Sequence, residues 1–141
     1  MAHPDLDTVL NALLPFAQQM LVKHGEFHPF GASMTVSGEV SLAAGMPETE
    51  KSESTTVIET LTFGFRQQAT DGLIRAMGIC FDSRVVPPGA SEKVDAICSR
   101  LEHMNGESAE VFLTYKKGWF GRVKYGSLFA SKGDSQIFGQ H

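Results

Sequence analysis

The sequence of 141 residues is 42% apolar and 20% charged, and its formal net charge is −4. A chain of this length buries enough surface for one independent core, so we expect a single domain over residues 1–141. The mild negative charge argues against bulk attraction to nucleic acid or to an anionic membrane. No run approaches the roughly 20 apolar residues that span a bilayer, so we expect no membrane association.

The start of the chain and the two cysteines indicate a compartment. Residues 1–5 lack the basic start and the apolar middle of a secretion signal. Cys80 and Cys98 both lie in strand-like runs, where a thiol behaves as a small hydrophobic group. We therefore expect a cytoplasmic protein with both thiols reduced, and a bridge between them is the less favoured alternative.

The first element in the chain is an amphipathic helix over about residues 5–24. Asp5 and Asp7 supply capping oxygens and negative charge at its start, and Gly25 supplies the left-handed residue that ends it. The apolar stripe keeps its phase across Pro15, so we predict one kinked helix rather than a helix that begins at the proline. The stripe consists of Leu6, Leu10, Leu13, Leu14, Ala17, Met20 and Leu21.

The stretch 24–32 turns the chain from this helix into strands. Its two glycines and its proline favour a turn, and we expect Phe27 and Phe30 to be buried beneath it. The alternation of apolar and polar residues that follows predicts a β-hairpin over residues 31–43, with a tight turn at Gly38-Glu39.

A polar stretch rich in serine and threonine, residues 45–56, carries no strong structure signal. Thr56 and Glu59 then have the spacing of a capping box, and the apolar residues after them share one helical face. We predict a second helix from Thr56 that ends before Asp71-Gly72. Its apolar face consists of Val57, Ile58, Leu61, Phe65 and Ala69.

The second half of the chain has the pattern of a β-sheet. Pro87-Pro88-Gly89 separates the first strand from the second, and Asn105-Gly106 predicts a type I′ turn between the second and the third. The predicted strands are residues 73–86, 93–104, 109–115 and 122–130, with a short edge strand at 136–138.

Runs of sequential hairpins give an antiparallel sheet, and two amphipathic helices can cover one of its faces. We therefore predict an α+β two-layer sandwich in the order α-β-β-α-β-β-β. Its antiparallel sheet has five to six strands, and both helices lie on one face. This order is similar to that of profilin-like and roadblock-like domains, an analogy by element order that carries no function.

Three short phrases carry a resemblance to a known group of proteins. They are Gly25-Glu26-Phe27-His28-Pro29-Phe30-Gly31-Ala32, the pair Glu102-His103 before a hairpin, and Tyr125-Gly126 in a late strand. Together they resemble a group of small uncharacterised bacterial α+β proteins that share a GEFxPFGA-like phrase. The resemblance implies a small bacterial α+β protein, and it assigns no catalytic role to any residue.

One candidate site is a pocket after the first helix, formed by Glu26, His28 and His103. A buried Glu26 would either accept backbone hydrogen bonds, tying the helix to the first strand, or stay protonated as a general acid or base. We favour the structural role, because such carboxylates also occur in purely structural networks. The His24–His28 spacing invites a zinc site, but the glycine and the proline beside it break the helical alignment, so we expect no metal.

The pair Glu102-His103 comes just before the predicted turn. Neighbouring residues of a strand point to opposite faces, so these two side chains cannot pair directly. We expect a solvated glutamate and a histidine that packs at the end of the hairpin.

The window Tyr115–Tyr125 contains four cations, four aromatic side chains and no acid, whereas the rest of the chain has eight cations against 16 acids, a net charge of −8. A single-stranded nucleic-acid platform uses interleaved cations and rings. Protein interfaces are likewise enriched in aromatic residues, and a third alternative is a loop that its aromatic residues merely seat. The candidate binding residues are Trp119, Phe120, Lys116, Lys117, Arg122 and Tyr125.

Other catalytic signatures are missing: the sequence has no P-loop, no Gly-x-Ser-x-Gly elbow and no dinucleotide fingerprint. We expect no cofactor and assign no catalytic residue. The first hypothesis is a small protein-interaction or regulatory module that binds another protein or itself, through residues 116–125 and a sheet edge. The alternatives are a small-molecule binder or enzyme with a site near Glu26, and a single-stranded nucleic-acid binder through residues 115–125.

Overall fold

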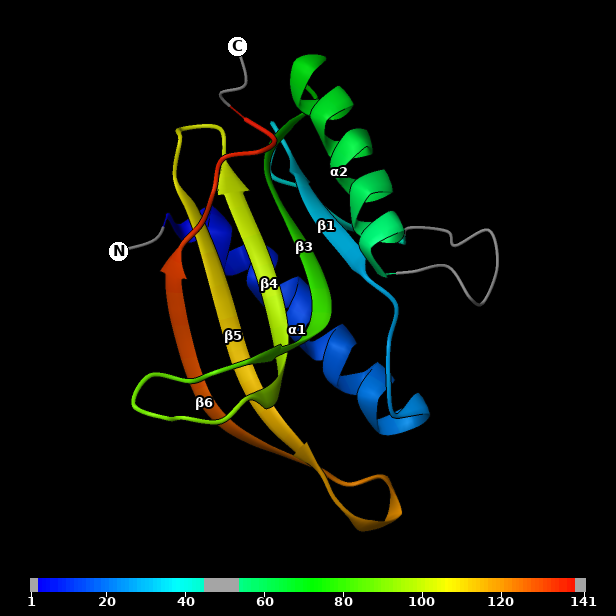
Figure 1. Ribbon diagram of the computed structural model, residues 1–141. Coiled ribbons are helices and arrows are strands. Elements are labelled where there is room, and N and C mark those ends of the chain that lie inside the picture. The colour runs from blue at the N-terminus through cyan, green and yellow to red at the C-terminus, as the bar shows by residue number, and fades with distance from the viewer. Residues whose placement is uncertain (1–2, 45–53, 139–141) are drawn as a thin grey trace.

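The computed structural model describes residues 3–44 and 54–138 (Figure 1). The six strands form one antiparallel sheet in the order β2-β1-β3-β4-β5-β6. These elements confirm the predicted α+β class and element order, while most of the stretch 45–56 lies outside the described residues. The elements are α1 (Pro4–His24), β1 (Phe30–Thr35), β2 (Val40–Ala44), α2 (Ser54–Thr70), β3 (Ile74–Val85), β4 (Val94–His103), β5 (Ser108–Lys117), the short 3-10 helix η1 (Trp119–Gly121) and β6 (Val123–Lys132).

The two helices lie on opposite faces of the sheet, so the predicted placement of both on one face is wrong (Figure 1). A Cβ atom at Gly78 would lie 2.7 Å from Cδ1 of Leu13 on α1, whereas a Cβ atom at Gly31 would lie 2.7 Å from the ring of Phe65 on α2. Gly78 pairs with Ala32, the neighbour of Gly31, and successive residues of a strand point to opposite faces. The molecule therefore has three layers: α1, the sheet and α2.

The residues of β3 explain this arrangement, because the strand carries apolar side chains in both directions. Ala76 and Cys80 belong to the cluster beneath α1, and Met77, Ile79 and Phe81 belong to the cluster beneath α2. A strand that is apolar on both sides is stable only when both sides are covered. α1 packs mainly on β3, β4 and β1, and its apolar cluster extends to β5. α2 packs on β3 and β1, so the α2 side of β5 and β6 stays largely uncovered by helices.

The first helix forms as one piece, as predicted, and Pro15 lies on its exposed side. Its cap differs from the prediction, because the Asp5 N–H donates to Nδ1 of His3 at 3.0 Å. Gly25 ends the helix in the left-handed region with φ of 75°. Neither α1 nor the other described helices combine the length and the hydropathy that a membrane span requires.

The junction after α1 buries its two aromatic residues, as predicted. Phe27 and Phe30 are 9% and 5% exposed, and their rings meet edge-on with centroids 5.9 Å apart. Phe16 of α1 meets Phe30 in a similar edge-on contact, with ring centroids 4.8 Å apart. Pro29, which precedes Phe30, is fully buried. This aromatic plug ties the end of α1 to the start of β1.

The β4–β5 loop differs from the predicted type I′ turn. The His103 N–H donates to the Glu107 carbonyl at 2.9 Å and closes a loop of three residues. Gly106 has a φ of 98°, whereas Asn105 keeps a negative φ, and a type I′ turn would need positive values at two successive residues. The β1–β2 loop is closed in the same way, with Gly38 at φ of 97°.

The predicted edge strand at 136–138 is not a strand, because its backbone is bound by a carboxylate instead. Gln136 donates its N–H to both oxygens of Glu102 at 3.0 Å, and Ile137 and Phe138 donate to Oε1 at 3.0 and 3.4 Å. Glu102 is 6% exposed, so the prediction of a solvated glutamate is also wrong. The clasp that we expected from Glu26 is made by Glu102, and it fastens the C-terminal segment to β4.

Cys80 and Cys98 are free and buried, as expected. Cys80 pairs with Ser99 and Cys98 pairs with Phe81 across β3 and β4, so the two thiols point to opposite faces of the sheet and cannot form a bridge. Burial raises the pKa of each thiol to about 12. Neither thiol therefore has the thiolate character that a nucleophile needs.

Candidate functional site

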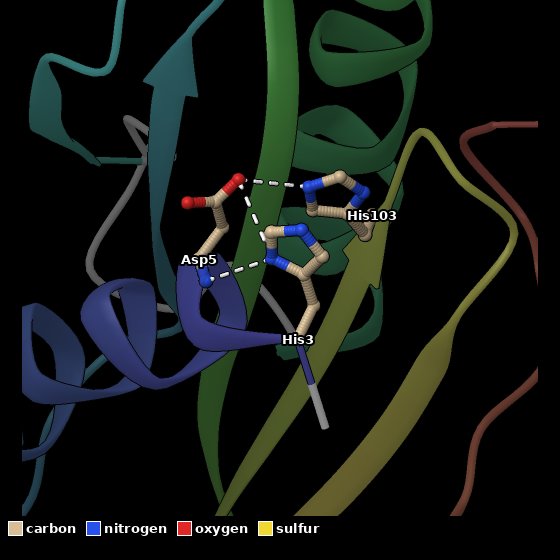
Figure 2. A group of neighbouring side chains, drawn as sticks. All are labelled: His3, Asp5 and His103. Carbon is tan, nitrogen blue, oxygen red and sulfur yellow. Dashed lines mark hydrogen bonds and ion pairs between the residues drawn. The ribbon is translucent and has the colours of Figure 1, made fainter. Parts of the chain in front are cut away.

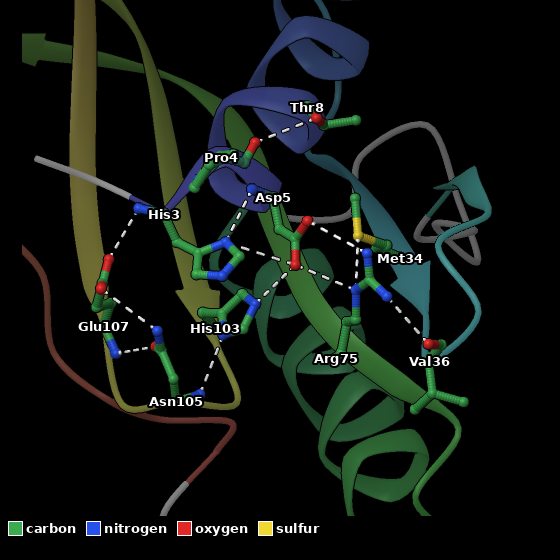
Figure 3. A network of polar contacts seen from close by, with 10 residues as sticks. All are labelled: His3, Pro4, Asp5, Thr8, Met34, Val36, Arg75, His103, Asn105 and Glu107. Atoms are coloured by element: carbon green, nitrogen blue, oxygen red, sulfur yellow. Dashed lines mark hydrogen bonds and ion pairs between the residues drawn. The ribbon is translucent and has the colours of Figure 1, made fainter.

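A polar network joins the first turn of α1 to three other segments of the chain (Figure 2, Figure 3). Its centre is the Asp5 carboxylate, whose Oδ2 lies 2.9 Å from Nε2 of His103 and 3.1 Å from Nε of Arg75. A second contact joins Oδ1 to Nη2 of Arg75 at 3.3 Å. Arg75 also donates to the Val36 carbonyl at 3.1 Å. The network thus links α1, β1, β3 and β4 at one end of the sheet.

The two imidazoles of the network already have hydrogen-bond partners. His103 accepts the Asn105 N–H on Nδ1 at 3.1 Å, so its proton is on Nε2 and is donated to Asp5. His3 accepts the Asp5 N–H on Nδ1 and stacks on His103, with ring centroids 4.0 Å apart and planes inclined by 24°. The His3 N–H donates to Glu107 at 2.8 Å, which connects the β4–β5 loop to the start of α1.

His3, Asp5 and His103 lie close enough to be considered as metal ligands, because their donor atoms are within 4.8 Å of one another. The arrangement does not fit a metal. Stacked rings direct their in-plane lone pairs side by side rather than toward a common point, and the Nδ1 atoms of both rings are used by backbone N–H groups. The Asp5 carboxylate also forms an ion pair with the guanidinium of Arg75, so a cation already lies where a metal would bind.

The hydrogen bonds of the His103 ring also argue against acid–base catalysis by this residue. Its side chain is 7% exposed, and both ring nitrogens are engaged, so neither can take a proton from a substrate. The network is therefore best explained as a clamp that holds the start of α1 on β3 and β4.

The clamp makes stability depend on pH below about 4. The hydrogen bond with His103 and the interactions with Arg75 lower the pKa of Asp5 below its ordinary value of 3.8. A lowered carboxyl pKa stabilises the folded state fully above the unfolded value and loses this contribution as the pH falls through the folded value. We expect Asp5→Asn to lower the free energy of unfolding by about 2 kcal/mol at pH 7, with a smaller loss at pH 3.

Urea denaturation at both pH values measures this difference. Asp7→Asn is the matched control, because Asp7 lies in the same helical turn but is exposed. We expect this variant to stay within about 0.5 kcal/mol of the wild type. Equal losses for the two variants at pH 7 would contradict the clamp.

The structure does not bring Glu26, His28 and His103 together. Glu26 and His28 are exposed and follow the C-terminal end of α1, and His24 is exposed at that end too. His103 contacts Asp5 in the first turn of the same 21-residue helix, which is about 30 Å long. The predicted pocket is therefore not formed, and Glu26 has no enclosed environment in which it could act as an acid or base.

The aromatic and basic window forms a protruding hairpin end, which we call the β5–β6 tip and define as residues 116–124 (Figure 1). Trp119 is 85% exposed and Phe120 is 98% exposed. Lys116, Lys117 and Arg122 are exposed around them, as is Lys124. The structure thus places five of the six predicted binding residues together on one projecting surface.

Tyr125, the sixth predicted residue, lies at the base of the tip and differs from the others. It is half-buried against the cluster beneath α1, and its hydroxyl has no hydrogen-bond partner among the described residues. Burial raises the pKa of Tyr125. This tyrosine seats the hairpin rather than presenting a ring to solvent.

The backbone of the tip is fixed. The Gly118 N–H donates to the Arg122 carbonyl at 2.7 Å, and the Arg122 N–H donates to the Trp119 carbonyl at 3.3 Å. Phe120 has a φ of 61°, a left-handed conformation that non-glycine residues rarely adopt. A Cβ atom at Gly121 would lie 3.6 Å from the carbonyl oxygen of Val22, so the tip rests on the last turns of α1.

A groove of about 280 Å³ lies at the base of the tip. Its lining includes Pro87, Val94, Lys116 and Lys124. The two lysines pair directly across β5 and β6, so the groove has a positive rim.

Tyr115, which also lines the groove, makes a buried polar contact that the sequence pattern did not reveal. Its hydroxyl donates to Oδ1 of Asp82 at 2.6 Å. Burial raises the pKa of Asp82, and burial together with the neighbouring carboxylate raises the pKa of Tyr115. The pair keeps its phenolic proton and joins β3 to β5 across β4.

Comparisons of the chain with protein families, curated proteins and solved structures gave no match.

Proposed function

We propose that the protein is an interaction module that binds a protein partner through the β5–β6 tip. The observation that carries the proposal is the exposure of Trp119 and Phe120 side by side at 85% and 98%. Each ring has roughly 150–250 Å² of surface to bury, which makes such residues the usual energetic anchors of interfaces.

The rigidity of the tip supports a specific partner. A residue such as Phe120 in the left-handed region costs roughly 1–3 kcal/mol, and such strain is found mainly at functional sites. The backbone hydrogen bonds of Gly118 and Arg122 hold this conformation before any partner arrives. A loop that is already ordered loses less entropy on binding, which favours docking into a shaped pocket.

The charge of the tip indicates the chemistry of that pocket. Lys116, Lys117, Arg122 and Lys124 surround the two rings, and no acid lies among residues 115–125. The complementary surface is an apolar pocket with an acidic rim, and attraction between the two speeds association. The rest of the chain has a net charge of −8, which would oppose docking on an anionic lipid surface or on nucleic acid.

The shape of the tip argues against the two alternatives. A single-stranded nucleic-acid platform presents successive rings on an open surface, whereas here the two exposed rings project from a hairpin end and Tyr125 is half-buried. The enzyme alternative depended on a pocket at Glu26, and Glu26 is exposed.

Substitution of Trp119 tests the proposal. We expect Trp119→Ala to weaken binding of the partner at least 30-fold, about 2 kcal/mol, because it removes the larger anchor. Stability should stay within about 0.5 kcal/mol, since the side chain makes few contacts. The partner is first captured from a cell extract on the immobilised chain, and binding of the purified partner is then measured by calorimetry.

Phe63→Ala is the matched control, because Phe63 is 66% exposed on α2, away from the tip. The control should bind like the wild type. A partner that binds Trp119→Ala and wild type equally would overturn the proposal. Binding of the chain to anionic vesicles or single-stranded RNA that is lost in Trp119→Ala would also overturn it, in favour of those ligands.

A further inference from the structure

Among the residues that the structure describes, the outer edge of β6 is longer than that of β2, the strand at the other edge of the sheet. β6 has 10 residues and pairs with β5, whereas β2 at the other edge has five residues. The unpaired N–H and C=O groups of a long edge strand are a template for another strand. Natural edge strands are usually protected by prolines, bulges or charges.

The edge of β6 has little of this protection. Between Lys124 and Lys132 there is no charged residue and no proline, and the irregularity in its pairing with β5 lies toward the tip, between Leu113 and Tyr115. The Gly133 N–H and the Ser127 N–H both point toward β5, where they donate to Ser108 and Thr114. Because backbone direction alternates along a regular strand, residues 128, 130 and 132, which lie beyond the irregularity, point their groups outward.

The side chains of β6 are apolar on both faces of the sheet. Leu128 pairs with Leu113 on the α1 side and is 61% exposed. Phe129 points to the α2 side, where it stacks on Phe112 with ring centroids 5.0 Å apart. An antiparallel sheet commonly has one solvated face, which carries polar side chains. β6 instead leaves an exposed leucine on one face and a partly buried aromatic stack on the other.

We propose that β6 pairs with β6 of a second copy of this chain, in antiparallel register about Phe129. Residue 128 then faces residue 130 of the second copy, and residue 132 lies opposite position 126. Lys132 lies opposite Gly126 of the second copy, so no like charges face each other, and pairing over 126–132 covers about 23 Å of edge.

A second copy supplies hydrogen-bond partners and apolar contacts to the edge of β6, because its own β6 has the same residues. Each Leu128 lies against Ala130 of the second copy on the α1 side and diagonally across from its Leu128. On the α2 side the two Phe112–Phe129 stacks join into one group of four rings. Antiparallel self-pairing is isologous and closes at two subunits. The interface uses residues outside the β5–β6 tip, so it is independent of the partner site proposed above.

Light scattering after size-exclusion chromatography of the full chain tests this inference. At tens of micromolar protein we expect twice the chain mass of 15.3 kDa. Leu128→Lys should give the monomer mass, because it places charge in the interface while its 61% exposure leaves the monomer fold intact. Leu42→Lys is the matched control: Leu42 is 48% exposed on the other edge strand, and this variant should remain a dimer.

A disulfide variant tests the register. In the proposed dimer the two Phe129 positions face each other with Cβ atoms about 5 Å apart, so Phe129→Cys should form a covalent dimer under oxidising conditions. Ser131→Cys, two residues away, should form little, and the native thiols are buried. A monomer mass for the wild type, or a dimer that persists in Leu128→Lys, would overturn the inference. Dissociation by Trp119→Ala would overturn it too, because association would then run through the tip.

Discussion

Glu102→Ala is expected to lower the free energy of unfolding by about 3 kcal/mol and to release residues 136–138 from the sheet. The carboxylate accepts N–H groups from three successive residues of this segment while being only 6% exposed. Hydrogen bonds to a charged acceptor contribute about 1.5–3 kcal/mol. Ile137 and Phe138 are 5% and 8% exposed, so their release also returns apolar surface to water.

Urea denaturation gives the loss of stability, and amide hydrogen exchange of residues 136–138 shows the release directly. Glu102→Gln keeps one acceptor oxygen and should lose less. Glu26→Ala is the matched control, because Glu26 is exposed, and it should stay within about 0.5 kcal/mol. If Glu102→Ala were as stable as this control, the C-terminal segment would be held by its apolar side chains and by the hydrogen bond from Arg66 to the Gln136 carbonyl.

Gly31→Val is expected to destabilise the fold by about 3 kcal/mol, because two layers meet at this glycine. A Cβ atom here would lie 2.7 Å from the ring of Phe65 and 2.9 Å from the carbonyl oxygen of Gly78. The phenyl ring could move, but the carbonyl belongs to the neighbouring strand β3 and is fixed in the ladder. The β-branched side chain would therefore push α2 and β3 away from β1.

Gly64→Ala is the control for this prediction, and we expect it to change the free energy of unfolding in the opposite direction. Gly64 lies in the middle of α2 with no atom within 4 Å of an added Cβ. Alanine should stabilise the protein by about 0.5–1 kcal/mol, because it restricts the unfolded chain and favours the helix. Thermal and urea unfolding measure both variants. A Gly31→Val protein of wild-type stability would mean that α2 does not pack closely on β1.

The order of helices and strands could be predicted because its signals are local. The apolar stripe of the first helix continues in phase across Pro15, and Gly25 marks its end. Prolines and glycines mark most of the remaining breaks in the chain. The Asn105-Gly106 turn was placed correctly but given the wrong type, since only Gly106 has a positive φ.

The placement of the helices could not be predicted from helix patterns alone, but β3 carried a signal. Residues 76–81 form a continuous apolar run rather than an alternating one, and such runs indicate strands covered on both faces. The run predicts a buried strand, and a strand that is apolar on both sides also requires a covering layer on each side of the sheet.

The polar networks escaped prediction because their partners are distant in the chain. Asp5 is bound to Arg75 and His103, 70 and 98 residues away, whereas its neighbours in the sequence indicate only a helix cap. Glu102 finds its donors 34 to 36 residues later. The residues of the β5–β6 tip were recognised because they are contiguous, although only the hairpin geometry shows that Trp119 and Phe120 face solvent.

The opposite orientation of Cys80 and Cys98 gives the protein two natural reporters of its internal motions. Cys80 is sealed by the layer of α1, and Cys98 belongs to the cluster on the α2 side. A thiol reagent can reach each sulfur only when its own side opens. The order in which the two thiols are alkylated would therefore show which side of the sheet opens first, without any label being introduced.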